Sequence, residues 1–355
     1  MASVAEEVDR ISHLPGDIIH HIFSFLPFKD VVKTSVLSKQ WRFAWTSTPF
    51  IDLALPSKGV VPWISRALSL CTATKIGKFH LDATVSELYI PAELDLWFCF
   101  AVVRKVEDVS LVFERHWSHY VPRILCSCAS LVSLQVSRCR FSRESTFHWP
   151  SLKKLCLGDD CLCDNGIMNV LSGCPVLESL TLCSIFINLQ IESRCLRELV
   201  IEAAYITMLD ISALNLVSLR LSGGFVVKSF RLNGIKNKDF LELCDFDEEQ
   251  FWGSQKDFYC VGNHLKSVEI VGFELDNEKS KLLLALAKFL LEKAVGLEKM
   301  ILDAEVRMPC QGLPIDPHDP WDFHDVIRLQ EGCRRASKNV EVIVNHRSNG
   351  LPHEL

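Results

Sequence analysis

The cysteines are the first side chains whose type and spacing suggest chemistry, because thiolates bind metal ions and act as nucleophiles. Cys156, Cys161 and Cys163 lie close together, and the last two are flanked by acids in the segment 159–164, DDCLCD. A structural zinc site normally uses two cysteine pairs whose members are two to four residues apart. Only one residue separates Cys161 from Cys163, and the same holds for Cys126 and Cys128. We therefore predict a solvent-exposed loop with buried thiols here, and no metal or other cofactor.

Other patterns that could support catalysis are weak. The fifteen cysteines and twelve histidines would allow a Cys-His nucleophile pair, but no local signature accompanies any of them. The sequence contains no glycine-rich phosphate loop of the Walker or dinucleotide-binding type. The acidic stretch Asp245, Asp247, Glu248 and Glu249 is interpreted as a solvated loop, with substrate binding as the alternative. The sequence predicts a protein that is not an enzyme, and a hydrolase with an unrecognised site is the remaining catalytic alternative.

Composition argues against several broad classes of protein. The 355 residues carry a formal net charge of −6, without the basic excess typical of proteins that bind nucleic acids or acidic membranes. The acidic N-terminus is unlike an export signal, and the most apolar stretch, residues 282–291, is about half as long as a membrane span. The cysteines are odd in number and scattered, which favours reduced thiols over a disulfide framework. We expect a globular protein of the cytoplasm, the nucleus or both.

Residues 11–50 show the spacing of short amphipathic helices. Pro15 and Asp17 suit a first helical turn, because proline has a helical φ in advance and an acid there interacts well with the helix dipole. Pro27 is expected to end this helix. The apolar side chains on one face of it, spaced by four and then three or four residues, are Ile18, Ile22 and Phe25 or Leu26.

Two further short helices are expected to follow. Asp30 can cap the second, and Ser38 can cap a third that carries Trp41 and Trp45 one turn apart. Three helices within about 35 residues enclose only a very small core. Such a unit usually needs a partner that covers its apolar faces, so this part of the sequence indicates a docking module.

The order of these residues resembles the F-box of plant proteins. The hallmark positions are Leu14-Pro15, Ile18 and Ile22, Leu26-Pro27, Val31-Val32, Ser35-Val36-Leu37-Ser38-Lys39 and Trp41-Arg42-Phe43-Ala44-Trp45. The resemblance implies a three-helix F-box that binds an acidic adaptor of the Skp type and, through it, a cullin. Residues 29–45 contain four basic side chains and one acidic side chain, which suits an acidic partner. The basic residues are Lys29, Lys33, Lys39 and Arg42, and the acidic residue is Asp30. The residues that the resemblance implies for the adaptor interface and its support are Leu14, Pro15, Ile18, Ile22, Leu26, Pro27, Val31, Val32, Leu37, Trp41 and Trp45.

An internal repeat occupies the middle of the chain. The pattern Leu-x-x-Leu-x-apolar occurs five times, where roughly one match is expected by chance. The matches start at Leu131, Leu152, Leu177, Leu196 and Leu216, and looser versions start at Ile76, Val106, Leu265 and Leu297. This spacing falls at the short end of the leucine-rich-repeat range. Because stacked strands bury a core that no single repeat can form, we expect an α-β solenoid, a curved arc of repeats.

The segments between the repeats predict what closes each turn. Residues 164–173, DNGIMNVLSG, have the polar start, apolar spacing and glycine stop of a two-turn helix. Later connections carry a second set of apolar positions, which we expect to form strands. These positions are Ile187/Leu189/Ile191, Ile206/Leu209/Ile211 and Val227/Phe230/Leu232.

The C-terminal part predicts a strand, a helix and another strand. The first strand starts near Leu265, Asn277 can cap the helix, and Gly296 ends it. Together with residues 335–344, RASKNVEVIV, this unit is similar to the FBD domain of plant F-box proteins. It departs from that domain in a proline-rich insertion at residues 309–320, where we expect a surface loop.

The chain is thus expected to combine α+β and α-β solenoid architecture. The expected parts are a disordered N-terminus (1–10), an F-box (11–50), a leucine-rich-repeat-like solenoid (51–262), an FBD-like unit (263–345) and a flexible tail (346–355). The resemblance implies the substrate-recognition subunit of an SCF-type cullin-RING ubiquitin ligase, which binds an unknown protein substrate through its repeats. The alternative is a leucine-rich-repeat interaction scaffold without ligase activity.

Overall fold

A computed structural model describes most of the chain, which divides into two compact units, Met1–Leu152 and Lys153–Leu355. The described residues are 11–83, 90–113, 119–158, 161–162, 166–185, 188–206, 208–223, 229–232, 263–274, 281–306 and 335–348. The predicted proline-rich loop, the acidic stretch 245–249, the predicted disordered N-terminus (1–10) and residues 349–355 of the predicted flexible tail lie outside these residues. Residues 346–348, predicted as the start of that tail, instead form the end of the strand Glu341–Ser348.

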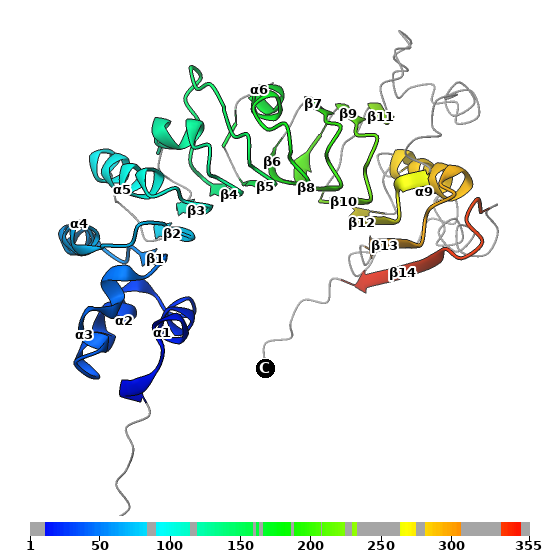
Figure 1. Ribbon diagram of the computed structural model, residues 1–355. Coiled ribbons are helices and arrows are strands. Elements are labelled where there is room, and N and C mark those ends of the chain that lie inside the picture. The colour runs from blue at the N-terminus through cyan, green and yellow to red at the C-terminus, as the bar shows by residue number, and fades with distance from the viewer. Residues whose placement is uncertain are drawn as a thin grey trace, which may run out of the picture. The chain divides into compact units, whose positions relative to one another are not determined.

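Proline residues set the start of the first helices in the N-terminal unit (Figure 1). Helix α1 (Gly16–Phe23) follows Pro15, and helix α2 (Phe28–Lys33) follows Pro27. Both prolines have φ values near −55°, which the pyrrolidine ring fixes before the helix forms. The other elements here are α3 (Trp41–Ala44) and the 3-10 turns η1 (Ile11–His13), η2 (Thr34–Val36) and η3 (Trp45–Ser47).

The second helix begins earlier than the sequence suggested. Asp30 lies inside the first turn of α2 and does not cap it; its carboxylate pairs with Lys33 at 2.6 Å. Pro27 takes the cap position, since its fixed φ already suits a helix start. Ser38 agrees better with the predicted capping role at the third helix. Its Oγ accepts a hydrogen bond of 3.4 Å from the backbone N–H of Trp41.

Aromatic rings form the small core between these helices. Phe23 of α1 and Trp41 of α3 meet edge to face with their centroids 5.6 Å apart, and Phe28 and Trp45 do so at 6.2 Å. All four side chains are buried. Edge-to-face pairs contribute about 0.5–1.5 kcal/mol beyond the burial of their area. Aromatic packing therefore contributes to the stability of the predicted small core, together with the buried aliphatic side chains of Ile19 and Val31.

Parallel strands follow in the first unit. Strand β1 (Phe50–Ala54) pairs with β2 (Lys78–Ala83), β2 with β3 (Asp108–Phe113), and β3 with β4 (Ser133–Ser137). Parallel neighbours need crossover connections, and short helical segments supply them. These segments are η4 (Lys58–Val60), α4 (Val61–Leu70), α5 (Pro91–Val103) and η5 (Arg123–Ser127).

The second unit contains a longer parallel arrangement in two layers. The strand order of the first layer is β5-β6-β8-β10-β12-β13-β14, and that of the second is β7-β9-β11. Figure 1 shows helix α6 and the second layer on the same side of the first layer. The strands of the first layer are β5 (Lys154–Leu157), β6 (Ser179–Ile185), β8 (Glu198–Tyr205), β10 (Ser218–Ser222), β12 (Ser267–Glu274), β13 (Lys299–Val306) and β14 (Glu341–Ser348). The remaining elements are β7 (Asn188–Glu192), β9 (Met208–Ser212), β11 (Ser229–Leu232), α6 (Gly166–Ser172) and α9 (Lys281–Lys293).

The repeat leucines lie in register in the core of each unit. In the second unit Leu180, Leu199 and Leu219 are neighbours on β6, β8 and β10. The leucines that start the five repeats are all fully buried. The predicted leucine pattern is therefore confirmed as a set of parallel strands with a shared apolar face.

The predicted connections are also confirmed where the structure describes them. Residues 166–172 form α6, and β7 and β9 pair with Leu189 opposite Leu209 and Ile191 opposite Ile211. β12, α9 and β13 form the expected strand, helix and strand.

Truncation of a repeat leucine should strongly destabilise the second unit. Leu199→Ala is expected to lower the free energy of unfolding by about 2–5 kcal/mol, because the side chain is fully buried between Leu180 and Leu219. Val200 points to the opposite face of β8 and is half-buried, so Val200→Ala should cost about 1 kcal/mol or less. Urea unfolding measures both, and equal losses would contradict this assignment of faces.

Candidate adaptor-binding surface

Large apolar side chains are exposed on the N-terminal helices, beside the aromatic core. The exposed fractions are 47% for Ile18, 73% for Phe25, 84% for Val36, 55% for Leu37 and 67% for Phe43. A single exposed apolar side chain is ordinary. Several within one small helical unit indicate a surface that another protein covers.

Helix α1 shows how the sequence separates core from surface. Its residues GDIIHHIF place two apolar pairs one turn apart. Ile19 and Phe23 are each 1% exposed, whereas Ile18 is 47% exposed and Ile22 is half-buried. The helix therefore turns one apolar stripe to the core and presents the neighbouring stripe towards solvent.

The segment before α1 is fastened to the third helix. Trp41 Nε1 donates a hydrogen bond of 3.0 Å to the carbonyl oxygen of Ile11, and Gln40 Nε2 donates one of 2.7 Å to that of Leu14. Trp41 also packs against Phe23, so one side chain connects the core with this segment. These bonds hold the segment that carries half-buried Leu14 and exposed Pro15 in one conformation.

The predicted interface residues fall into two groups by exposure. Val31, Trp41 and Trp45 are buried, so they support the surface from within. The others are exposed or half-buried, and a partner could touch them directly: Leu14, Pro15, Ile18, Ile22, Leu26, Pro27, Val32 and Leu37. Their contact with an adaptor stays a prediction.

The sequence-based site left out Phe25, Val36 and Phe43, although all three are highly exposed. Spacing could have identified Phe43. It lies two residues from both Trp41 and Trp45, and residues two apart on a helix point in nearly opposite directions. If the tryptophans face the core, Phe43 must face outwards.

The surface carries excess positive charge. The ion pair of 2.6 Å between Lys33 and Asp30 leaves Lys29, Lys39 and Arg42, which are exposed and form no ion pair with another described residue. The Arg42 guanidinium lies 5.6 Å from the centre of the Phe43 ring, a cation–π arrangement. Apolar side chains bordered by cations are suited to a partner with acidic groups around an apolar patch.

The thiols noted in the sequence lie mainly in the interior. Cys126, Cys128 and Cys161 are buried and Cys156 is half-buried, while Cys163 lies outside the described residues. Within the described part of the chain, no group of three His, Cys, Asp or Glu side chains could hold a metal ion. No helix of that part is long and apolar enough to cross a membrane. The absence of a cofactor and of enzymatic activity stays a prediction.

Thiol alkylation should distinguish buried from exposed cysteines. Burial raises the pKa of Cys71 from 9.0 to about 11 and that of Cys174 to about 12. Their thiolate fractions at pH 8 are therefore about 100-fold or more below that of an ordinary thiol. In the native protein, iodoacetamide at pH 8 should label the exposed Cys99 and Cys195 before the buried Cys71 and Cys174. Mass spectrometry measures the order, and rapid labelling of Cys174 would contradict it.

Two family descriptions match the chain. The F-box domain matches residues 11–53, which include the whole surface described above. The family described as "FBD-associated F-box protein At5g56370, LRR repeats" matches residues 94–234. Both matches end before residue 263, so the similarity of the C-terminal part to an FBD domain stays a prediction.

Curated proteins of Arabidopsis thaliana are also similar. F-box/LRR-repeat protein 25 is 35% identical over 179 residues, which cover 49% of this chain and 67% of that protein. F-box protein At5g03100 is 36% identical over 175 residues, 49% of this chain and 56% of that protein. F-box/LRR-repeat protein At3g03360 is 35% identical over 188 residues, 50% of this chain and 39% of that protein. The chain thus spans about half the length, or less, of several curated relatives that it matches.

A helical unit with an exposed apolar surface, followed by parallel strands with a buried leucine repeat, defines a class of proteins that bind other proteins. Within that class, the chain belongs to the F-box/LRR-repeat protein family.

Proposed function

We propose that this chain is the substrate-recognition subunit of an SCF-type cullin-RING ubiquitin ligase. Its F-box helices bind a Skp-type adaptor, which connects the chain to a cullin, and its repeats bind a target protein. The observation that carries this proposal is the exposed apolar surface over the aromatic core of residues 11–47. An unpartnered surface of this kind, bordered by Lys29, Lys39 and Arg42, fits an acidic adaptor.

In this proposal the chain contributes proximity and no bond chemistry of its own. Holding a target lysine close to the charged conjugating enzyme converts a bimolecular ubiquitin transfer into one at high effective concentration. The rigid attachment of the docking segment matters here, because a loosely held receptor would lower that concentration. The hydrogen bonds from Trp41 and Gln40 to residues 11 and 14 supply such attachment.

The repeats are the target-binding part in this proposal. In-register parallel strands with a shared buried face support an arc-shaped solenoid, in which the outward residues of successive strands form one extended surface. We also propose a cytoplasmic or nuclear location. The ten described cysteines are free thiols, which are typical of a reducing compartment.

The receptor role is tested in plant cells with the tagged full chain and its Ile18→Asp/Leu37→Asp variant. The wild type should co-purify with a Skp-type adaptor and a cullin. Some of the neighbours, the proteins that proximity labelling finds close to the chain, should accumulate when the proteasome is blocked. The variant should lose the adaptor and keep these neighbours. If the wild type retains neighbours but neither adaptor nor cullin, the chain is a scaffold and the proposal is wrong.

A further inference from the structure

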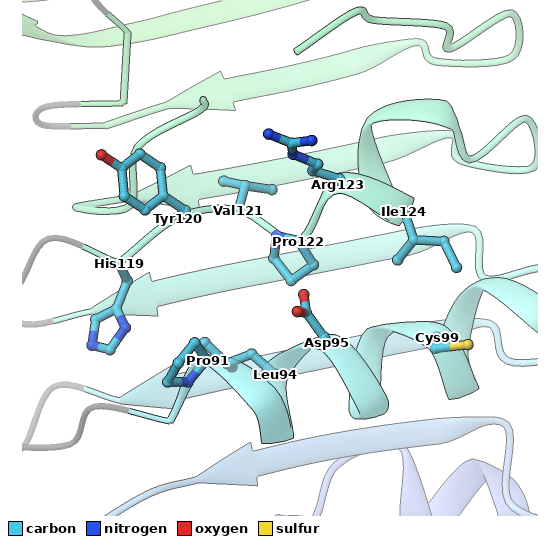
Figure 2. A pocket seen from close by; sticks show the side chains of 10 residues that line it. All are labelled: Pro91, Leu94, Asp95, Cys99, His119, Tyr120, Val121, Pro122, Arg123 and Ile124. Carbon is cyan, nitrogen blue, oxygen red and sulfur yellow. The ribbon is translucent and has the colours of Figure 1, made fainter. Parts of the chain in front are cut away.

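A pocket of about 470 Å³ lies in the first unit, between helix α5 and residues 119–124 (Figure 2). Leu94, Val121 and Pro122 form a buried apolar floor. Asp95 and Cys99 of α5, one helical turn apart, are exposed at its edge. The volume falls within the usual range of ligand-binding pockets.

The wall opposite α5 is held firmly in place. The Val121 N–H donates to the Arg140 carbonyl at 2.9 Å, and the Arg140 N–H donates to the His119 carbonyl at 2.8 Å. The ring of His119 stacks on Phe113 with centroids 4.2 Å apart. Just beyond the pocket, buried Trp149 donates from Nε1 to the Leu125 carbonyl at 2.7 Å. A preorganised wall lowers the entropy cost of binding.

The charge of the pocket is set by Asp95. Figure 2 shows its carboxylate pointing from α5 towards Pro122. The other charged lining residue, Arg123, pairs with Glu144 at 3.1 Å, so its charge is largely compensated. Asp95 has no ion-pair partner among the described residues. The pocket therefore offers a carboxylate above an apolar floor, which suits a cation attached to an apolar body.

The rim indicates that the occupant extends beyond the pocket. Tyr120 on one wall is 60% exposed, and Asp95, Cys99 and Arg123 around the opening are exposed as well. Small-molecule sites normally enclose most of their ligand. An open rim with an exposed aromatic side chain is more typical of contact with a longer chain.

We infer that this pocket binds a peptide segment of a target protein in which a basic residue stands next to an apolar one. The apolar side chain packs on Leu94, Val121 and Pro122, and the basic group pairs with Asp95. Tyr120 contacts a flanking residue of the peptide. The inference deepens the proposed function and rests on it, since it assigns part of target recognition to the α5 region.

Random dodecapeptides displayed on phage and selected on the full chain test this inference. The enriched sequences should share a Lys or Arg beside Leu, Ile, Phe or Val. Fluorescence anisotropy of an enriched peptide should show binding weakened about fivefold by Asp95→Asn, as for a partly exposed ion pair, and further by Asp95→Lys. Glu93→Gln is the matched control, because Glu93 lies on the same helix and does not line the pocket.

Failure to enrich such peptides, or equal binding by wild type, Asp95→Asn and Asp95→Lys, would overturn the inference. Enrichment of acidic peptides would overturn it as well. Light scattering tests whether a second copy of the chain occupies the pocket instead. If the wild type forms a dimer and Asp95→Lys dissociates it, the pocket binds a second copy and the inference is wrong. Adaptor binding, measured in parallel, should be unchanged in all three variants. If the wild type binds the adaptor but enriches no such peptides, only this inference is refuted. If the wild type binds the peptides but not the adaptor, only the ligase proposal is refuted.

Discussion

The double substitution Ile18→Asp/Leu37→Asp should weaken binding of a purified Skp-type adaptor at least about 100-fold, since each such apolar side chain is worth about 1.5–3 kcal/mol when buried. A buried, unpaired carboxylate adds a further penalty. Both side chains are about half exposed in the free chain, so the thermal midpoint should change little. Biolayer interferometry and calorimetry measure the two quantities.

The control for this double variant is Val295→Asp, which makes the same type of substitution once, at an exposed apolar site (61% exposed) in the second unit. It should leave adaptor affinity unchanged. An equal loss in Val295→Asp, or full affinity in the double variant, would show that residues 18 and 37 do not contact the adaptor.

Trp41→Ala should unfold or loosen the N-terminal helices, with a loss of about 3–5 kcal/mol, because it removes a buried ring, its contact with Phe23 and its hydrogen bond to Ile11. Trp41→Phe keeps an aromatic ring against Phe23 and should cost about 1–3 kcal/mol, from the lost hydrogen bond and a small cavity. Hydrogen exchange of the α1 and α3 amides measures this loss locally.

Comparison of the two Trp41 variants shows whether Trp41 stabilises the N-terminal helices or contacts the adaptor directly. Trp41→Phe should retain most adaptor affinity, since Trp41 is buried and acts by positioning the docking segment. A protected α1 in Trp41→Ala, together with lost adaptor binding, would instead show that the indole itself contacts the partner.

The repeats were the most predictable part of the fold. In Leu-x-x-Leu-x-Leu the last two leucines point to one side of a strand, and this two-residue period appears directly as the registered pairs Leu180–Leu199 and Leu182–Ile201. The start of α2 was predicted less well. Asp30 favours a helix start as a capping side chain, and Pro27 favours one through its fixed φ. The local sequence does not show which of the two residues determines where the helix begins.

The docking surface could be predicted only in part, for a reason visible in α1. Ile18/Ile22 and Ile19/Phe23 are both apolar pairs one turn apart, so periodicity alone does not show which pair faces the core. Burial of the second pair depends on packing against Trp41, which lies eighteen residues from Phe23 in the sequence. The pocket of α5 was not predictable either, because residues 91–99 and 119–124 meet only through the stacking of β3 and β4.

The central claim is that residues 11–47 form an adaptor-binding surface. Its most direct test is titration of the purified full chain with a purified Skp-type adaptor by calorimetry. We expect a one-to-one complex with a dissociation constant below about 1 μM, as stable apolar interfaces of this kind provide. Absence of a complex at tens of micromolar, with a folded chain, would contradict the assignment.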